Sequence, residues 1–211
     1  MPETDPVVNC LFPVAGGCVP AEHGYALYGA LHQGWPDLET YNWLQIGPIT
    51  PLRRRQRQTW VGEGAALLLR APVSRLPLLF TLAETTHTLD QGTITLGRPT
   101  ITPLRPSPVL YSPFVTVKVH KPGGRLYPWD DLSLERFVAG VDARAAAHGL
   151  TLGRAHVDIQ QPRWLHIQEG GASGYPVAVI GLSEQESLLL QQVGLGGRRK
   201  MGCGVLVPWP L

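Results

Sequence analysis

The sequence predicts an α+β protein of two tandem ferredoxin-like (RRM-like) domains, and three observations predict it. Each half of the chain contains strand-like apolar segments interrupted by two helical segments. A segment with five prolines in fifteen residues separates the halves. In the second half the order strand–helix–strand–strand–helix–strand is clear, which is the split βαβ order of ferredoxin-like folds. The first half suggests the same order.

The N-terminal domain is predicted over residues 1–98. A buried strand is expected over 7–14 (VVNCLFPV). Pro20 favours a helix start and Gly34 favours its end, so a helix is expected from Pro20 to about His32. The other elements expected in this half are strands over 44–49, 66–69 and 92–96 and a short helix over 74–84.

A stiff, extended linker is predicted over residues 99–113. Its prolines lie at positions 99, 103, 106, 108 and 113. Proline has no N–H to donate and restricts its neighbours, so we expect no regular element at this density. The domain boundary is therefore placed in this segment.

The C-terminal domain is predicted over residues 114–211 and includes a glycine-rich loop. Asp130 or Asp131 is expected to cap a helix that ends at Gly149. A capping box beginning at Ser183 opens a second helix, which Gly194 closes. Strands are expected over 114–120, 155–159, 164–167, 177–182 and 205–207.

Composition narrows the classes of function. The chain is 44% hydrophobic and has no apolar run of membrane-spanning length. Its start lacks the basic and apolar regions of a secretory signal. Its three cysteines have no metal-ligand spacing, so neither a disulfide framework nor a zinc site is expected. These features predict a soluble, cytoplasmic protein without a membrane partner.

Positive charge is gathered in two places, although the net charge is only +2. A partner with phosphate groups would therefore have to bind these clusters. For each cluster the alternative is a solvated surface loop. The clusters are Arg53-Arg54-Arg55 with Arg57, and Arg198-Arg199-Lys200.

Two stretches together resemble one family. Val19–Tyr28 (VPAEHGYALY) is similar to the first-helix motif of the MYXAN-type branch of the Cas-six family of CRISPR-associated precursor-RNA endoribonucleases. Gly194–Gly204 (GLGGRRKMGCG) is similar to the glycine-rich loop near the C-terminus of the wider superfamily. The resemblance covers nearly the whole chain in order and spacing, and it implies the same tandem ferredoxin-like fold.

The resemblance also implies an activity. The family cleaves CRISPR repeat RNA without a metal or other cofactor, by attack of a ribose 2′-hydroxyl on the adjacent phosphorus. The products are a 2′,3′-cyclic phosphate and a 5′-hydroxyl. The expected partner is a repeat RNA stem-loop, and subunits of a CRISPR effector complex are further candidates.

Two histidines are candidates for the general base. His23 is expected in the first helical turn, where the positive end of the helix lowers a histidine pKa and attracts phosphate. His32 is expected near the helix C-terminus, about 13 Å along the axis from His23 and on the opposite face, so at most one is the base. We favour His23, with a core or capping histidine as the alternative. Tyr28 is expected to orient the base or contact the phosphate, unless it only packs against the sheet.

The glycine-rich loop is the candidate RNA-binding segment. Its glycines would let backbone amides approach the RNA backbone, and its basic side chains would contact phosphates. The residues concerned are Gly194, Gly196, Gly197, Arg198, Arg199 and Lys200. Tryptophans could stack on bases, but core burial is predicted for Trp129, Trp164 and Trp209.

Two departures from the branch motivate a second hypothesis. Where the branch has histidines after the first helix, this chain has Glu39 and Gly47. A non-catalytic subunit that binds repeat RNA is therefore the alternative function. A ferredoxin-like module that binds protein or a small molecule is the third.

Overall fold

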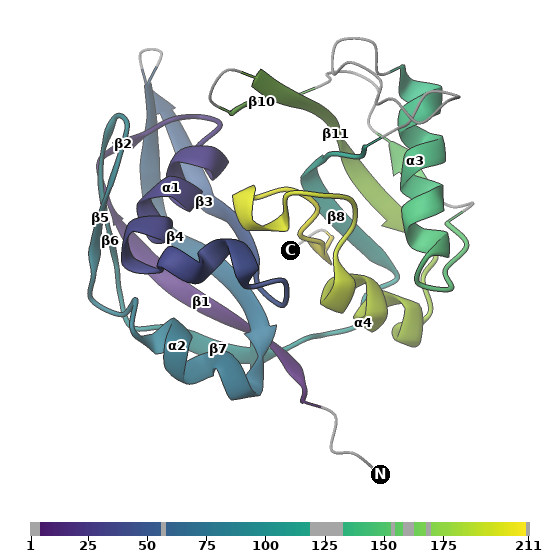
Figure 1. The fold of residues 1–211 in the computed structure, drawn as a ribbon, viewed down its shortest axis with the longest axis horizontal. Helices are drawn as coiled ribbons and strands as arrows, with labels where there is room; N and C mark the ends of the chain where they lie inside the picture. The colour runs from purple at the N-terminus through teal and green to yellow at the C-terminus, as the bar shows by residue number, and fades with distance from the viewer. Residues whose placement is uncertain are drawn as a thin grey trace. The chain divides into compact units, whose positions relative to one another are not determined.

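The computed structural model describes residues 5–55, 58–118, 133–152, 155–157, 163–167 and 170–209. The chain forms two compact units, Met1–Leu104 and Arg105–Leu211 (Figure 1). Their boundary lies inside the segment predicted as a linker. Among the described helices, none combines the length and apolar character needed to cross a membrane.

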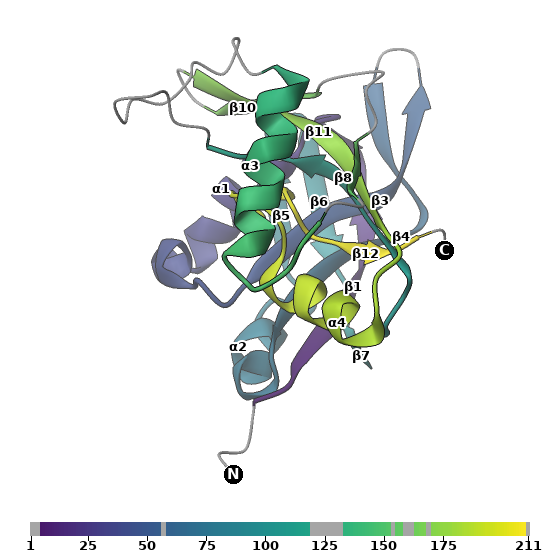
Figure 2. The same ribbon diagram turned by 90° about the vertical axis from the view of Figure 1, so that its right-hand side faces the viewer.

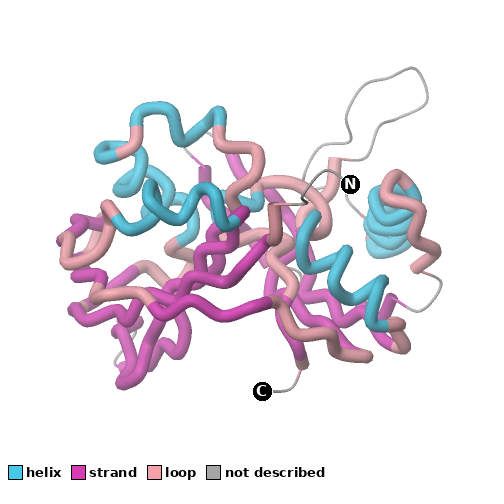
Figure 3. Tube along the Cα trace, turned by 90° about the horizontal axis from the view of Figure 1, so that it is seen from below, coloured by secondary structure: helices cyan, strands magenta, loops and turns pink. Residues whose placement is uncertain are grey.

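The N-terminal unit has the ferredoxin-like strand order. β4 lies between β1 and β3, and the other side of β1 pairs with β6 and β7, with every pairing antiparallel. Figure 3 shows the helices of this unit on one side of its strands. The elements are β1 (Val7–Gly16), β2 (Cys18–Val19), α1 (Gly24–Gly34), η1 (Pro36–Thr40), β3 (Gln45–Arg55), β4 (Gln58–Pro72), η2 (Val73–Arg75), α2 (Leu76–Phe80), β5 (Thr86–Leu89), β6 (Gly92–Leu96) and β7 (Thr100–Pro103).

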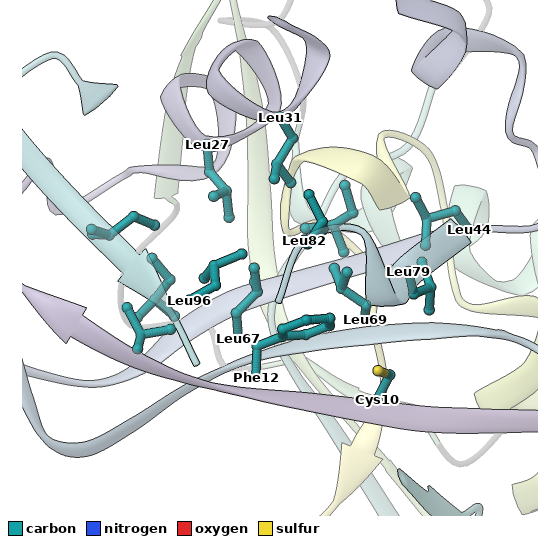
Figure 4. Packing of buried hydrophobic residues seen from close by; sticks show 14 of the residues in the cluster. Cys10, Phe12, Leu27, Leu31, Leu44, Leu67, Leu69, Leu79, Leu82 and Leu96 are labelled. Carbon is teal, nitrogen blue, oxygen red and sulfur yellow. The ribbon is translucent and has the colours of Figure 1, made fainter. Parts of the chain in front are cut away.

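The core of this unit lies between α1 and the sheet. Leu27 and Leu31 point from α1 toward Phe12, Leu67 and Leu69, as Figure 4 shows. All five side chains are at most 1% exposed. Burying side chains of this size contributes about 1.5–3 kcal/mol each, so this contact fixes which face of α1 turns to the sheet.

The first helix begins later than predicted. Residues 21–23 form a turn, and α1 starts at Gly24. The reason is that Val19 still pairs with Thr59 of β4 as part of β2, so the chain must turn before it can enter the helix. The prediction of a helix from Pro20 is therefore wrong by one turn, whereas its predicted end near Gly34 is confirmed.

Strands β3 and β4 are much longer than the two strands that the sequence predicts in this region. The expected strands over 44–49 and 66–69 are parts of β3 and β4, which pair from Gln45↔Arg70 to Arg55↔Gln58. The basic cluster at Arg53 and Arg54 therefore lies in a strand and not in a loop. The predicted strands over 7–14 and 92–96 are confirmed as β1 and β6.

The C-terminal unit repeats the strand order. β11 lies between β8 and β9, β12 pairs with the other side of β8, and β10 pairs with the first residues of β11. Figure 2 shows α3 and α4 in front of these strands. The elements are β8 (Val109–Val115), α3 (Leu134–Ala146), β9 (Ala155–Val157), β10 (Arg163–Ile167), β11 (Gly170–Ile180), α4 (Glu184–Val193), η4 (Arg199–Met201) and β12 (Val207–Pro208).

The proline-rich segment is not free of regular structure, so that prediction is wrong. β7 pairs with β1, and β8 already begins at Val109. Two of these prolines lie where the strand pairing ends or is irregular. Pro103 ends β7, and Pro113 lies at a register shift between β8 and β11 that also contains Pro176.

Local capping signals position the helices of the C-terminal unit. The capping box of α4 is confirmed: Ser183 N–H donates to Glu186 Oε2 at 2.8 Å, and Glu186 N–H donates to Ser183 Oγ at 3.3 Å. The cap of α3 is Ser133, whose Oγ accepts from the Arg136 N–H, while the predicted caps at positions 130 and 131 lie outside the described residues. The helix α3 ends before Gly149, as predicted, and the backbone of Gly149 is in the left-handed region.

Candidate functional site

The candidate catalytic residues at and within α1 differ in burial. Leu27 and Leu31 are buried against the sheet, and His23 follows the same side with only 4% of its surface exposed. Tyr28 and His32 are half-buried, and the Tyr28 side chain packs against the edge of the same core. His23 is therefore the more buried of the two histidines.

His23 is bonded to a strand of the sheet. Its Nε2 accepts a hydrogen bond from the backbone N–H of Ile49 at 2.8 Å. Ile49 follows an irregularity in β3, where the pairing with β4 shifts between Ile46 and Ile49 and Pro48 has no N–H. The imidazole thus satisfies a buried amide at the point where the strand ladder is disturbed.

This environment argues against His23 as the general base. Burial lowers the pKa of His23, although the nearby carbonyl groups of Pro20 and Ala21 partly oppose this effect. The neutral ring must carry its proton on Nδ1, because its single lone pair on Nε2 accepts from Ile49. The His23 ring therefore has no free lone pair with which to take a proton from a substrate. This agrees with the alternative stated above, that His23 is a core histidine.

His32 and Tyr28 form a pair of half-buried rings on α1. Their ring centroids are 5.9 Å apart, with the planes tilted by 42°. Burial raises the pKa of the Tyr28 hydroxyl, and the Glu39 carboxylate and Tyr25 add to the rise. The hydroxyl therefore stays protonated at neutral pH and can donate a hydrogen bond.

No local sequence pattern predicts that Glu39 acts on Tyr28. Glu39 lies in η1, which follows α1 directly, and its charge acts on Tyr28. An imidazole and a phenol on α1 and a carboxylate on η1 are therefore the candidate groups. Groups of these types can accept a proton, donate one and orient a ring.

The glycines of the C-terminal loop pack it onto β8. Gly196 has φ 78°, and a Cβ added there would lie 2.3 Å from the Thr116 carbonyl oxygen. The Gly197 N–H donates to the same oxygen at 2.9 Å, and the Gly204 N–H donates to Phe114 O at 2.7 Å. These amides are used within the fold, which leaves the side chains of the loop for contacts with a ligand.

The basic side chains of this loop differ in their surroundings. Arg198 is exposed and has a left-handed backbone, with φ 57°. Arg199 is half-buried and donates from Nη1 to the carbonyl oxygen of Val193, at the C-terminus of α4. Burial lowers the pKa of Arg199, but a guanidinium remains charged at neutral pH. Lys200 is half-buried.

The other basic cluster lies on the β3–β4 hairpin. The side chains of Arg53 and Arg54 are exposed, whereas that of Arg55 lies outside the described part of the structure. Arg53 Nη2 lies 3.6 Å from Glu63 Oε2, with 64% and 92% of the two side chains exposed. An ion pair this exposed is weak and can exchange partners.

The predicted burial of Trp209 is wrong, because 48% of its surface is exposed and its ring packs against Tyr111 with centroids 4.2 Å apart. The side chains of Trp129 and Trp164 lie outside the described residues. Sequence reasoning also did not single out Trp60, which is 38% exposed on β4.

Comparisons with known proteins agree on one family and one fold. A family model described as Cas6 Crispr matches residues 8–210. The "CRISPR-associated endonuclease Cas6" of Myxococcus xanthus (strain DK1622) is 29% identical over 201 residues, which are 95% of this chain and 81% of the relative.

Solved structures are similar in fold at low sequence identity. A "CRISPR associated protein Cas6" has a TM-score of 0.62 at 14% identity and covers 97% of this chain and 99% of its own. "An RAMP protein binding different RNA substrates" has a TM-score of 0.64 at 12% identity and covers 95% and 98%. Together with the strand orders above, these likenesses confirm the α+β fold of two tandem ferredoxin-like domains.

Proposed function

Because the chain belongs to the Cas6 family of CRISPR-associated proteins, we propose that it is an endoribonuclease that cleaves CRISPR repeat RNA into guide RNAs. The Myxococcus relative, which is named an endonuclease, supports the activity. The similar RAMP structure, described as binding different RNA substrates, supports RNA as the ligand.

The proposed reaction needs no metal ion. The 2′-oxygen attacks the adjacent phosphorus and loses its proton to a base on the protein. The bond from phosphorus to the 5′-oxygen breaks, and the leaving oxygen takes up a proton. The products are a 2′,3′-cyclic phosphate and a 5′-hydroxyl, so the protein supplies proton transfer, alignment and charge.

His32 is the proposed general base, in place of His23. The observation that carries this choice is the half-buried position of the His32 ring beside the ring of Tyr28. In this assignment Tyr28 donates a hydrogen bond to the phosphate. Glu39 helps to keep the Tyr28 hydroxyl protonated.

The proposed RNA contacts come from exposed cations. Arg198, Arg53 and Arg54 have exposed side chains that can reach phosphates, and half-buried Lys200 lies next to the exposed part of its loop. Arg199 is assigned to holding the loop on α4 and not to the RNA. The expected substrate is a repeat stem-loop recognised through its shape and unpaired nucleotides.

Cleavage of repeat RNA in excess EDTA tests this function. We expect wild type to cut and the new 3′ ends to resist phosphatase until acid opens the cyclic phosphate. His32→Ala should slow single-turnover cleavage by about 10²- to 10⁴-fold without weakening RNA binding. His148→Ala is the matched control, because His148 is an exposed histidine after α3.

The outcomes separate the parts of the proposal. Cleavage that depends on added Mg²⁺ would contradict the metal-free mechanism. His32→Ala cleaving as fast as wild type would contradict the choice of base. A deoxyribose at the mapped cleavage site should block the reaction, because it removes the nucleophile.

A non-catalytic RNA-binding subunit of a CRISPR effector complex is the second candidate. It is favoured by Glu39 and Gly47, which stand where the MYXAN-type branch has histidines, and by the commitment of His23 to Ile49. Wild-type protein that binds repeat RNA tightly but never cuts it, with or without Mg²⁺, would favour this function over the enzyme.

A further inference from the structure

Trp60 is exposed although it lies within a long strand. It pairs with Cys18 of β2 on one side and with Arg53 of β3 on the other, so it is not at a sheet edge. The next pair along the hairpin, Leu52 and Val61, packs against the core. Because successive side chains alternate between faces, Trp60 and Arg53 point to the face away from that core.

The indole of Trp60 is held on a rigid support. A Cβ added at Gly17 would lie 3.9 Å from Trp60 Cζ3, so the ring lies beside a backbone without a side chain. That backbone is fixed on both sides, since the Gly17 N–H donates to Thr93 O at 3.2 Å and the Val61 N–H donates to Gly17 O at 3.1 Å. The ring is thus an exposed aromatic surface on a hydrogen-bonded sheet.

The charge around this ring is suited to an anion. Residues directly opposite in an antiparallel pair share a face, which places the guanidinium of Arg53 on the face of Trp60. The partner of Arg53 is Glu63, in an exposed ion pair that a phosphate can replace. Arg54, next along β3, is also exposed, but the alternation of side chains places it on the opposite face, so it is not part of this site.

We propose that Trp60 and Arg53 form a binding site for an unpaired segment of RNA, with one base stacked on the indole and an adjacent phosphate on Arg53. Only an unpaired nucleotide can offer its base face to a side chain, so the ligand is single-stranded and not the stem. The proposal rests on the proposed function for its RNA partner. It does not depend on cleavage.

Photocrosslinking tests the contact on the unaltered protein. Repeat RNA with single-stranded flanks, carrying 5-iodouridine at one unpaired position at a time, is irradiated with wild-type protein and digested with trypsin. The peptide Gln58–Arg70 (QTWVGEGAALLLR) contains Trp60 as its single aromatic residue. We expect the crosslink on this peptide, and its absence from every labelled position would overturn the site.

Binding measurements test the energetic role. Trp60→Ala should weaken binding of flanked repeat RNA by about 10-fold or more, and Trp60→Phe by less, because a phenyl ring still stacks. Binding of the stem-loop without flanks should not change in either variant. Glu63→Gln should strengthen binding of the flanked RNA, because it releases Arg53.

The outcomes distinguish this site from the proposed function. Unchanged affinity of Trp60→Ala for flanked RNA overturns the site, whether or not the protein cleaves. Wild type that binds but does not cut contradicts the enzyme and leaves the site standing. If Trp60→Ala alters only the oligomeric state, the ring contacts a second copy of the chain and not RNA. That result would also overturn the proposal.

Discussion

The Nε2 atom of His23 accepts a hydrogen bond from the Ile49 amide at 2.8 Å, joining the start of α1 to β3 across 26 residues of sequence. This contact gives His23 a structural role. It also explains how β3 tolerates Gly47 and Pro48 without leaving the Ile49 amide buried and unpaired.

Replacing His23 should therefore affect stability more than cleavage chemistry. His23→Ala leaves a buried N–H without an acceptor and creates a cavity, which should cost about 3 kcal/mol of unfolding free energy. His23→Gln places an amide oxygen near the position of Nε2 and should cost about 1 kcal/mol. Urea unfolding measures both values. Equal costs for the two variants would show that the hydrogen bond is unimportant.

The lowered pKa of His23 predicts a loss of stability on mild acidification. The neutral ring is favoured in the folded state, so the unfolded state, with a pKa near 6.5, binds the proton first. Stability from this group is fully present above about pH 6.5. It falls by at most about 1.4 kcal/mol per pH unit as the pH drops toward the folded-state pKa.

Comparison with His23→Gln isolates this effect. His87 also has a pKa lowered by burial and will leave a residual slope in both proteins. The informative quantity is the difference between wild type and His23→Gln in urea unfolding from pH 7 to pH 5. We expect wild type to lose more stability over this range, and parallel curves would contradict the assignment of a buried neutral ring.

Features set by neighbours in sequence could be predicted, and features set by distant contacts could not. The capping box at Ser183 depends on residues within a few positions, and it was predicted. The acceptor role of His23 depends on an amide in β3, which no local pattern shows. For the same reason the proximity of Glu39 to Tyr28 appeared only in the fold.

The long β3–β4 hairpin shows the same limit. Its outer part contains Pro51, Gly62 and Gly64, which disfavour strands when taken alone. The hairpin forms because β4 has partners on both sides, with Trp60 between Cys18 and Arg53. Pairing of this kind overrides local propensity, so the basic cluster could be found from the sequence but not placed on a strand.

Two glycines with the same backbone conformation should respond differently to alanine. Gly149 and Gly196 have φ values of 76° and 78°. A Cβ at Gly149 meets no atom within 4 Å, whereas one at Gly196 lies 2.3 Å from Thr116 O. Gly149→Ala should cost about 1 kcal/mol for the left-handed backbone alone. Gly196→Ala should cost about 1–3 kcal/mol more, because the loop must move off β8.

Urea unfolding of both variants checks this difference, and the two sites lie in the same compact unit. Equal losses of stability would show that the loop does not depend on close packing against Thr116.

The neighbouring arginines of the loop should separate binding from stability. Arg198→Gly removes an exposed charge, and glycine suits the left-handed backbone at this position better than arginine does. It should weaken RNA binding and reduce the slope of log Kd against log salt by about 1, without lowering the melting temperature. Arg199→Ala removes the donor to Val193 and should destabilise the fold by about 1–2 kcal/mol.

Titrations with repeat RNA at several salt concentrations, combined with thermal unfolding, resolve the two roles. Arg199→Lys keeps the charge but loses the fork geometry of the guanidinium, so it should restore only part of the stability, and neither Arg199 variant should change the salt slope. The assignment fails if Arg198→Gly binds RNA with the affinity and salt dependence of wild type. It also fails if Arg199→Ala unfolds at the wild-type temperature, because the contact with the end of α4 would then contribute nothing to holding the loop.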